Sequence, residues 1–350
     1  MIEFRLATKE DNAQLIELTA AVGMDGEISL RIDRNPDFFK LLELRGESMV
    51  AVAEDNGKII GVACASLQNC YLDGKLCPVQ YVGDFKVLKA YRKKGVGLSL
   101  LNLLVQKANQ VGSDLVFLNI SKGNEKPMFH FKNQSTYPDF VNIGLFSIYQ
   151  FIGKKRKSQK EKYPITSETS SVELLNFLDE NYQKYELGSQ VTKEQLEKTS
   201  IYTIRDGGLI LGAVCLVDTM KIKQNVVTKV SWRLNLLLKL LNLVSPITGL
   251  SKMPVLNEPV KMMYIKFLAI RDNDKHILKR LIDHSRSIAY NKSYSFVSIG
   301  CHERDPLQQQ FSGMNKLTFE SIGMMTSLKN NTEYIDKVKA GIPFEDFSLV

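Results

Sequence analysis

Apolar and polar positions follow the same pattern in two separate stretches of the chain. Residues 57–64 and 208–215 each begin with a turn glycine and continue as an apolar strand that contains a second glycine, at an offset of 151 residues. A strand-like run precedes each stretch, Met49 to Glu54 and Ile201 to Arg205. Two strand-like runs joined by a glycine turn predict a β-hairpin. The chain therefore contains an internal repeat, which predicts two copies of one structural unit.

Each predicted hairpin is followed by a strand, a helix and another strand. These runs are Tyr81 to Leu88, Val96 to Gln110 and Leu115 to Ile120 in the first half, and Met262 to Ile270, Lys275 to Tyr290 and Ser295 to Gly300 in the second. Strands that alternate with helices predict an α/β fold. We expect its sheet to be mixed, as in α+β proteins. We expect one domain at residues 1–153, a basic linker at 154–166 and a second domain at 167–350.

The second half carries an insertion between its hairpin and its next strand. The offset between the halves grows there from 151 to about 180 residues, which predicts a leucine-rich insertion at about 219–261. Its central run, Trp232 to Val244, is too short to span a bilayer. The leucines lie around most of a helix, which favours burial against protein as a lid or interface helix. A helix on a membrane surface is the alternative, because polar residues interrupt the run.

The composition narrows the class of protein. A chain of 350 residues with 44% hydrophobic and 24% charged residues is typical of a globular protein with two domains. The N-terminal run Met1 to Arg5 contains an acid where a signal peptide is basic and then apolar, and no apolar run is long enough to span a membrane. We therefore expect a cytoplasmic protein. The five cysteines show no zinc-ligand spacing, so we expect reduced thiols and no metal site.

The net charge of +8 is concentrated in one short stretch. Residues 1–150 carry 17 basic and 17 acidic side chains, whereas residues 151–163 carry six basic and one acidic. This stretch lacks the interleaved aromatic residues of a single-strand binder and the helical pattern of a groove reader. We interpret it as a solvated linker and expect no nucleic-acid partner, with nucleic-acid association through residues 154–162 as the weaker alternative.

One motif indicates chemistry. The sequence Arg92-Lys93-Lys94-Gly95-Val96-Gly97 joins a predicted strand to a predicted helix. A strand that enters a helix through a glycine turn directs several unpaired backbone N–H groups at one point, and the helix dipole adds positive charge there. Glycines let a phosphate approach the backbone, and arginine and lysine supply charged contacts. The motif is not a dinucleotide fingerprint, because Leu100 stands at the third glycine position. We predict a site for a phosphate or pyrophosphate.

At these residues the chain resembles the GNAT superfamily of acyl-CoA-dependent N-acyltransferases, whose members carry Arg/Gln-x-x-Gly-x-Gly/Ala after their fourth strand. The resemblance extends over about residues 1–150, where Ile2 to Ala7 resembles the first strand, Asp11 to Thr19 the first helix and Phe140 to Gln150 the closing strand. It implies two tandem GNAT-like folds. The second copy is degenerate, because its loop, Arg271 to Ile277, has no glycine and places two acids where phosphate would sit. We therefore expect one acetyl-CoA per chain.

The resemblance also implies roles for individual residues. The backbone of residues 93–98 would hold the CoA pyrophosphate, and the strand end would pair with the pantetheine arm. Phe131 stands where many members carry a tyrosine that protonates the leaving thiolate. Asp84 is the best-placed carboxylate for a general base. The implied CoA-binding residues are Val87, Leu88, Arg92, Lys93, Lys94, Gly95, Val96, Gly97, Leu98 and Asn124.

The function that this resemblance implies is N-acetyl transfer from acetyl-CoA to a primary amine, by direct attack in a ternary complex. The alternative is a non-catalytic CoA- or acyl-CoA-binding regulatory module. The sequence leaves open the amine acceptor, the length of the acyl chain and the oligomeric state, a homodimer included.

Overall fold

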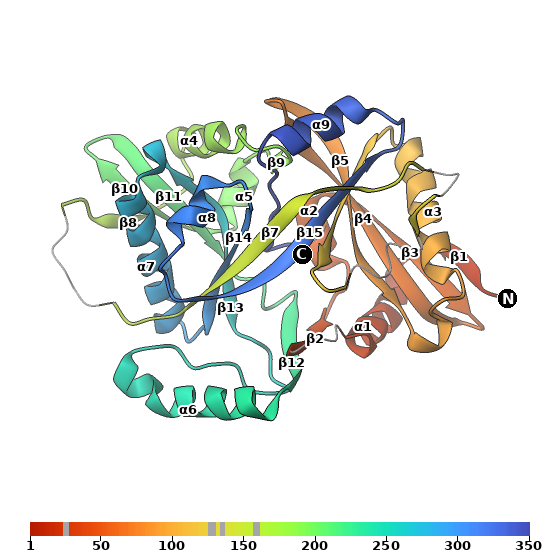
Figure 1. Ribbon diagram of the computed structural model, residues 1–350, viewed down its shortest axis with the longest axis horizontal. Coiled ribbons are helices and arrows are strands. Elements are labelled where there is room, and N and C mark those ends of the chain that lie inside the picture. The colour runs from red at the N-terminus through yellow and green to blue at the C-terminus, as the bar shows by residue number, and fades with distance from the viewer. Residues whose placement is uncertain (24–27, 125–130, 134–136, 157–161) are drawn as a thin grey trace.

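The computed structural model describes residues 1–23, 28–124, 131–133, 137–156 and 162–350 of the chain. Figure 1 shows the first half on the right and the second half on the left. The first half contains β1 (Glu3–Leu6), α1 (Asn12–Ala21), β2 (Ile28–Asp33), α2 (Lys40–Arg45), β3 (Glu47–Asp55), β4 (Lys58–Leu72), β5 (Lys75–Val87), α3 (Val96–Gln110), β6 (Leu115–Ser121) and β7 (Val141–Ile152), with short 3-10 helices η1 (Lys9–Asp11) and η2 (Lys89–Tyr91).

The second half repeats this order with additions. It contains β8 (Ile165–Glu168), α4 (Val172–Tyr182), β9 (Gly188–Ser189), α5 (Lys193–Glu197), β10 (Ser200–Asp206), β11 (Leu209–Val217), β12 (Gln224–Val230), α6 (Trp232–Thr248), β13 (Met262–Ile270), η4 (Arg271–Asn273), α7 (Lys275–Asn291), β14 (Phe296–His302), α8 (Pro306–Gln310), β15 (Lys316–Ser327) and α9 (Thr332–Ala340). Both predicted hairpins, β3–β4 and β10–β11, are confirmed. Part of the predicted linker, residues 157–161, lies outside the described residues.

Within the described ranges, thirteen strands form one mixed sheet. Its order is β1-β3-β4-β5-β6-β15-β7-β14-β13-β11-β10-β8, and β9 pairs with β4. The pairs β5–β6 and β13–β14 are parallel. Helix α3 connects the first of these pairs and α7 connects the second, so each half contains one strand–helix–strand crossover. The predicted α/β fold with a mixed sheet is confirmed.

The second strand of each hairpin, β4 or β11, is buried on both faces. Its side chains alternate between two apolar clusters, one on each face of the sheet. On β4, Val62 and Cys64 belong to the apolar cluster around α1, whereas Ala63 and Ala65 belong to the cluster around α3. On β11 the matching sets are Ala213 and Cys215, which pack with α4, and Val214 and Leu216, which pack with α7. Successive side chains of a strand point to opposite faces. The repeated sequence therefore encodes the same three-layer packing twice.

The second glycine of each repeat lets a helix pack directly on the sheet. A Cβ atom on Gly61 would lie 3.2 Å from Cγ1 of Val96, the first residue of α3. A Cβ atom on Gly212 would lie 2.7 Å from Cγ2 of Ile277 in α7. These close approaches explain why both repeats keep a glycine inside an otherwise apolar strand.

The halves exchange strands, which the sequence did not reveal. Strand β7, near the end of the first half, pairs with β14 of the second, and the late strand β15 lies between β6 and β7. Figure 1 shows β7 and β15 crossing the middle of the molecule and the C-terminus lying at the junction. Phe347 and Ser348 near that terminus are buried. A further link is the two-stranded ribbon of β2 and β12.

The leucine-rich insertion forms α6, but its leucines are not buried as the sequence predicts. One stripe that includes Leu238 and Leu241 packs on the second half. The other large apolar side chains of the helix are exposed: Trp232, Leu236, Leu237, Leu240, Leu243, Val244 and Ile247. Among the described helices, none is long and apolar enough to cross a bilayer.

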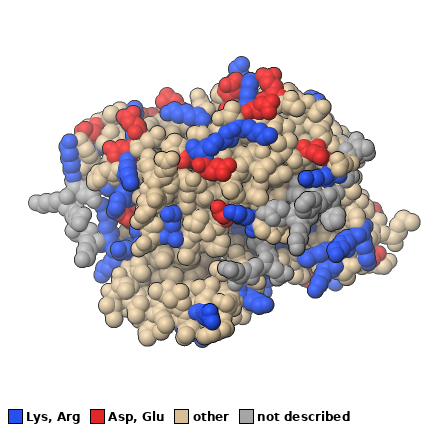
Figure 2. Space-filling model, viewed as in Figure 1, with Lys and Arg blue, Asp and Glu red and all other residues tan. Residues whose placement is uncertain are grey.

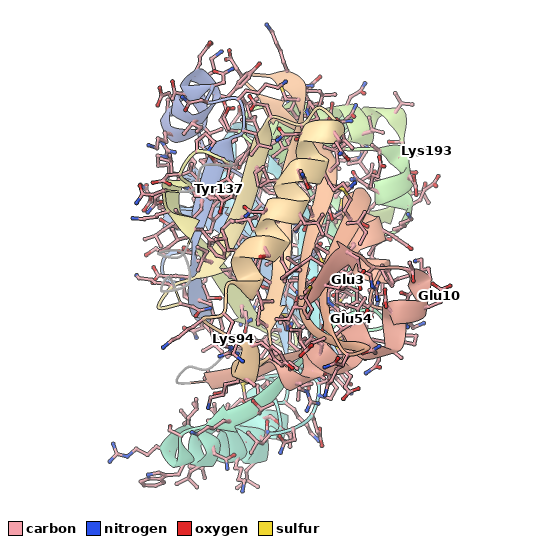
Figure 3. All side chains as sticks on the ribbon, turned by 90° about the vertical axis from the view of Figure 1, so that its right-hand side faces the viewer. Glu3, Glu10, Glu54, Lys94, Tyr137 and Lys193 are labelled. Carbon is pink, nitrogen blue, oxygen red and sulfur yellow. The ribbon has the colours of Figure 1, made fainter. Side chains whose placement is uncertain are left out.

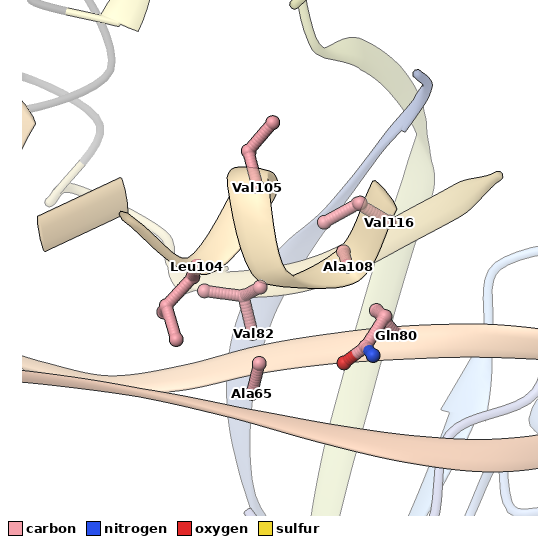
Figure 4. A pocket seen from close by; sticks show the side chains of 7 residues that line it. All are labelled: Ala65, Gln80, Val82, Leu104, Val105, Ala108 and Val116. Atoms are coloured by element: carbon pink, nitrogen blue, oxygen red, sulfur yellow. The ribbon is translucent and has the colours of Figure 1, made fainter. Parts of the chain in front are cut away.

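Gln80 is a polar residue inside the apolar core beneath α3. Figure 4 shows its amide among Ala65, Val82, Leu104 and other apolar side chains. Gln80 is 1% exposed, and neither amide atom has a hydrogen-bond partner in the described part of the chain. A buried polar group without a partner costs about 1–3 kcal/mol.

We expect Gln80→Met to stabilise the protein by about 1–3 kcal/mol, because methionine has a similar shape and removes the unpaired amide. Urea denaturation measures the change in the free energy of unfolding. Gln110→Met, at the exposed end of α3, is the matched control and should change little. A loss of stability in Gln80→Met would show that the amide is satisfied in solution.

Candidate active site

The basic glycine motif lies where β5 leads through η2 into α3. Gly95 is the N-cap residue of α3 and has a left-handed backbone, with φ of +78°. This conformation favours glycine, since it costs a residue with a Cβ atom free energy. Among the described residues no side chain caps the helix start, so the first N–H groups of α3 are open to an external acceptor. The loop therefore combines a glycine turn with an open helix start, and anion binding there stays a prediction.

The side chains of this loop surround the helix start. Figure 3 shows Lys94 at the N-terminal end of α3. The Lys94 ammonium lies 5.1 Å from the centre of the Tyr91 ring, whose hydroxyl donates to Asp55 Oδ2 at 2.8 Å. Arg92 is exposed, and its Nε donates to the carbonyl of Val87 at 3.1 Å. The basic groups are therefore fixed close to the helix N-terminus.

The strand that enters the loop separates from its neighbour. Strands β5 and β6 pair only from Val79–Leu115 to Val82–Leu118. Beyond Val82, β5 stays paired with β4, while β6 stays paired with β15. A register shift in the β4–β5 pairing makes a β-bulge at this point, and there Asp84 has a φ of +49°. The bulge bends β5 away from β6 and leaves an open strand edge.

The backbone groups along this open strand edge differ in whether they already have a hydrogen-bond partner. The N–H of Leu88 already donates to the carbonyl of Ile60 at 2.9 Å. Because successive residues of a strand direct their backbone groups to opposite sides, Val87 faces the separated strand β6. Asn119 stands on β6 just beyond the last pair, and its amide atoms are buried without a hydrogen-bond partner among the described residues. Among the described residues, the backbone N–H of Val87 and the side chain of Asn119 thus place unpaired polar groups near the point where the strands separate.

Two aromatic side chains pack beside the start of α3. The rings of Phe85 and Phe131 meet edge to face, with centroids 5.5 Å apart. A Cβ atom on Gly97 would lie 3.3 Å from Phe85 and 3.8 Å from Phe131. Asn124 lies at the end of β6, where its N–H donates to Ser121. The residues that directly follow Asn124, 125–130, are outside the described part.

Asp84 forms a buried ion pair with Arg34, which follows β2. Burial alone would raise the pKa of Asp84, but the charges of Arg34 and Lys86 outweigh it and hold the pKa of this carboxyl below its usual value. The other guanidinium nitrogens of Arg34, Nε and Nη1, are buried without a hydrogen-bond partner in the described part of the chain. Asp84 is therefore ionised at neutral pH, next to a cation with unused donors.

Comparisons with known proteins agree with this geometry. Residues 11–129 match the family described as Acetyltransferase (GNAT) family. The matched stretch contains the basic glycine loop at the start of α3. No curated protein sequence matches the chain.

Solved structures extend the similarity of the GNAT fold to both halves. A tandem GNAT protein from the clavulanic acid biosynthesis pathway has 11% identity and a TM-score of 0.60, over 94% of this chain and 99% of that one. Saccharomyces cerevisiae N-myristoyltransferase with bound myristoyl-CoA has 10% identity and a TM-score of 0.60, over 93% and 82%. A GCN5-related N-acetyltransferase from Anabaena variabilis has 11% identity and a TM-score of 0.51, over 93% and 72%. The chain has a tandem GNAT fold.

In the second half, a side chain of the equivalent loop caps the start of the following helix, α7. Asp274 is the N-cap of α7, and its Oδ1 accepts from the N–H groups of His276 at 2.7 Å and Ile277 at 3.2 Å. A carboxylate at a helix start takes the position that a phosphate would need and repels a second anion. The two loops therefore differ in whether a side chain caps the helix that follows.

Several buried charges next to the GNAT domain were not found from the sequence. Lys223, just before β12, is 5% exposed, and the charges of Arg34 and Asp84 act on it. From the C-terminal segment, Glu345 accepts from Arg45 Nη2 at 2.9 Å. No local pattern identifies these residues, because the β2–β12 ribbon and the late strand β15 bring them together from distant parts of the chain.

Burial, together with the charge of Arg34, lowers the pKa of Lys223 to about 7. The group is ordinarily protonated up to about pH 10.4 in an unfolded chain, so between these pH values the unfolded state binds more protons. Stability should therefore rise with pH from about 7 upward, by at most about 1.4 kcal/mol per pH unit.

We expect Lys223→Met to remove this dependence. Urea denaturation at pH 6, 7.5 and 9 measures it, as the difference in the free energy of unfolding between the natural protein and the variant. Lys221→Met, on the exposed part of the same turn, controls for the loss of a lysine. Parallel pH curves for the natural protein and Lys223→Met would contradict the expectation.

Proposed function

We propose that this protein is an N-acetyltransferase that moves an acetyl group from acetyl-CoA to a primary amine by direct attack in a ternary complex. Residues 1–153 would hold acetyl-CoA, and residues 167–350 would cover the acceptor side. The observation that carries the proposal is the contrast between the uncapped start of α3 and the start of α7, which Asp274 caps. It supports one CoA site per chain, in the first half.

The structure supports a CoA path along the opening between β5 and β6. The backbone of residues 93–98 would bind the pyrophosphate, with Arg92 and Lys94 beside it. The N–H of Val87 would pair with the pantetheine arm, whereas Leu88 would contribute its side chain, because its N–H is already bonded. Asn124, at the end of β6, would contact the cofactor from the other side.

Acetyl transfer requires a neutral amine. An alkylamine with a pKa near 10.4 is mostly protonated at pH 7, so the enzyme must remove a proton. We propose Asp84 as the carboxylate that accepts it, because Asp84 is ionised and stands at the bulge where β5 leaves β6. A leaving thiol with a pKa near 8.5 departs as a thiolate when donors stabilise it, so Phe131 in place of a tyrosine does not forbid the reaction.

The alternative is a non-catalytic CoA- or acyl-CoA-binding regulatory module. The observation that favours it is the apolar contact of Phe131 with Phe85, which places no proton donor at that position. Both functions require CoA binding, so turnover with a panel of primary amines distinguishes them.

We expect Gly95→Asp to abolish CoA binding. The open space around Gly95 admits the side chain, so the variant folds, but its carboxylate takes the free N–H groups of α3 and repels phosphate. Calorimetric titration with acetyl-CoA and with CoA measures affinity and stoichiometry. For the natural protein we expect one site per chain.

Gly57→Asp is the matched control for this experiment. Gly57 also has a φ of +78° and open space around it, but it lies in the β3–β4 turn. Its substitution should cost similar stability and leave CoA binding unchanged. Normal affinity in Gly95→Asp would refute the assignment of the loop, and two sites per chain would refute the closure of the second loop.

We expect Asp84→Asn to lower kcat/KM for the amine by about a hundredfold or more, while CoA affinity stays unchanged. Because this variant leaves Arg34 buried without its partner, the double variant Asp84→Asn with Arg34→Gln serves as the second arm. Steady-state kinetics with a fixed amine measures both. Turnover that returns in the double variant would show that Asp84 only balances the charge of Arg34.

A further inference from the structure

Helix α6 presents an apolar face to solvent. Trp232 is 72% exposed, Leu243 75% and Ile247 89%. At about 100° per residue, the seven exposed apolar side chains of α6 fall within an arc of about 140°, and the exposed Arg233 lies within the same arc. Leu238, Leu241 and Ser245, on the opposite side, face the protein. The helix therefore has two apolar faces, of which the second half covers only one.

The body of the protein holds α6 firmly. The side chain of Asn242 bonds to both the N–H and the carbonyl of Met253, at 2.5 Å and 3.2 Å. Gly249, which follows the helix, accepts from the N–H of Lys155 at 2.7 Å. Figure 3 shows α6 projecting below the body of the molecule. The exposed face is thus part of a fixed, protruding helix.

The surroundings of this face are positively charged. From Thr219 to Asn257 the sequence contains no Asp or Glu. In Figure 2 the lobe that Figure 1 identifies as α6 is tan, with blue side chains and no red on this side. Exposed basic residues of α6, of its flanking segments and of the paired segment at 154–155 are Lys154, Lys155, Lys229, Arg233, Lys239 and Lys252. The basic stretch and the leucine-rich insertion, separate in the sequence, meet at Lys155 and Gly249.

We propose that α6 lies on the surface of an anionic lipid bilayer. Its apolar arc would enter the boundary between headgroups and acyl chains, Trp232 would sit at headgroup level, and the basic side chains would contact lipid phosphates. A single protruding helix with a wide apolar arc, a tryptophan, exposed basic residues and no acid between Thr219 and Asn257 fits this interface. Anionic headgroups complement the charge of these basic residues, and each basic side chain near the surface should strengthen binding about fivefold.

The single tryptophan of the chain makes the test specific, because Trp232 is itself in α6. We would titrate the full chain with vesicles of phosphatidylcholine containing about a quarter phosphatidylglycerol, and record Trp232 emission and flotation with the vesicles. We expect a blue shift of the emission and co-flotation, both weakened by high salt. Vesicles of phosphatidylcholine alone should bind less of the protein.

Two variants separate the apolar and the charged contributions. Leu236→Gln with Leu243→Gln and Ile247→Gln should abolish flotation without unfolding, because these side chains are already exposed. The matched control, Val172→Gln with Leu209→Gln and Leu317→Gln, changes three exposed apolar residues elsewhere and should float normally. Arg233→Gln with Lys239→Gln should weaken binding to anionic vesicles by about fivefold per removed cation.

Three results would overturn the proposal. The first is an unchanged Trp232 emission at millimolar anionic lipid. The second is equal flotation of the outer-face variant and the natural protein. The third is a blue shift that depends on protein concentration without lipid and accompanies dimers in sedimentation, which would assign the face to a second copy of the chain.

Discussion

The structure depends on the position of β15 between β6 and β7. This late strand completes the sheet of the first half and at the same time carries β7 to the second half. The two halves are therefore one hydrogen-bonded sheet, and neither can turn relative to the other without breaking ladders. The same arrangement brings the C-terminal segment to the junction, where Glu345 meets Arg45 across 300 residues of sequence.

Within this rigid frame, the two copies of the strand–helix–strand unit differ at the start of their helix. The backbone of each unit directs the N-terminus of a helix at one point, α3 in the first half and α7 in the second. Gly95 leaves that point open, while Asp274 fills it with a carboxylate. The two copies thus differ at the residue that precedes the helix, where an acidic side chain would oppose a second negative charge.

The insertion in the second half has two separate structural roles. Its strand β12 pairs with β2 and brings Lys223 close to the ion pair of Arg34 and Asp84. In a buried setting such charges interact more strongly than at the surface, so each alters the protonation of its neighbours. Its helix α6 faces away from the body and carries apolar side chains into solvent.

The sequence by itself determined the local units and the anion loop. The hairpins, both crossover helices and the basic glycine turn follow from short-range periodicity and turn chemistry, which neighbouring residues specify. Even the capping of α7 by Asp274 was readable from the acids in its loop. Tertiary structure alone decided how the units join: the exchange of β7 and β15, the pairing of Arg34 with Asp84, and the exposed face of α6. Strand pairing and burial depend on which distant segments meet, and an all-round pattern of leucines is the same whether one face of the helix is covered or both.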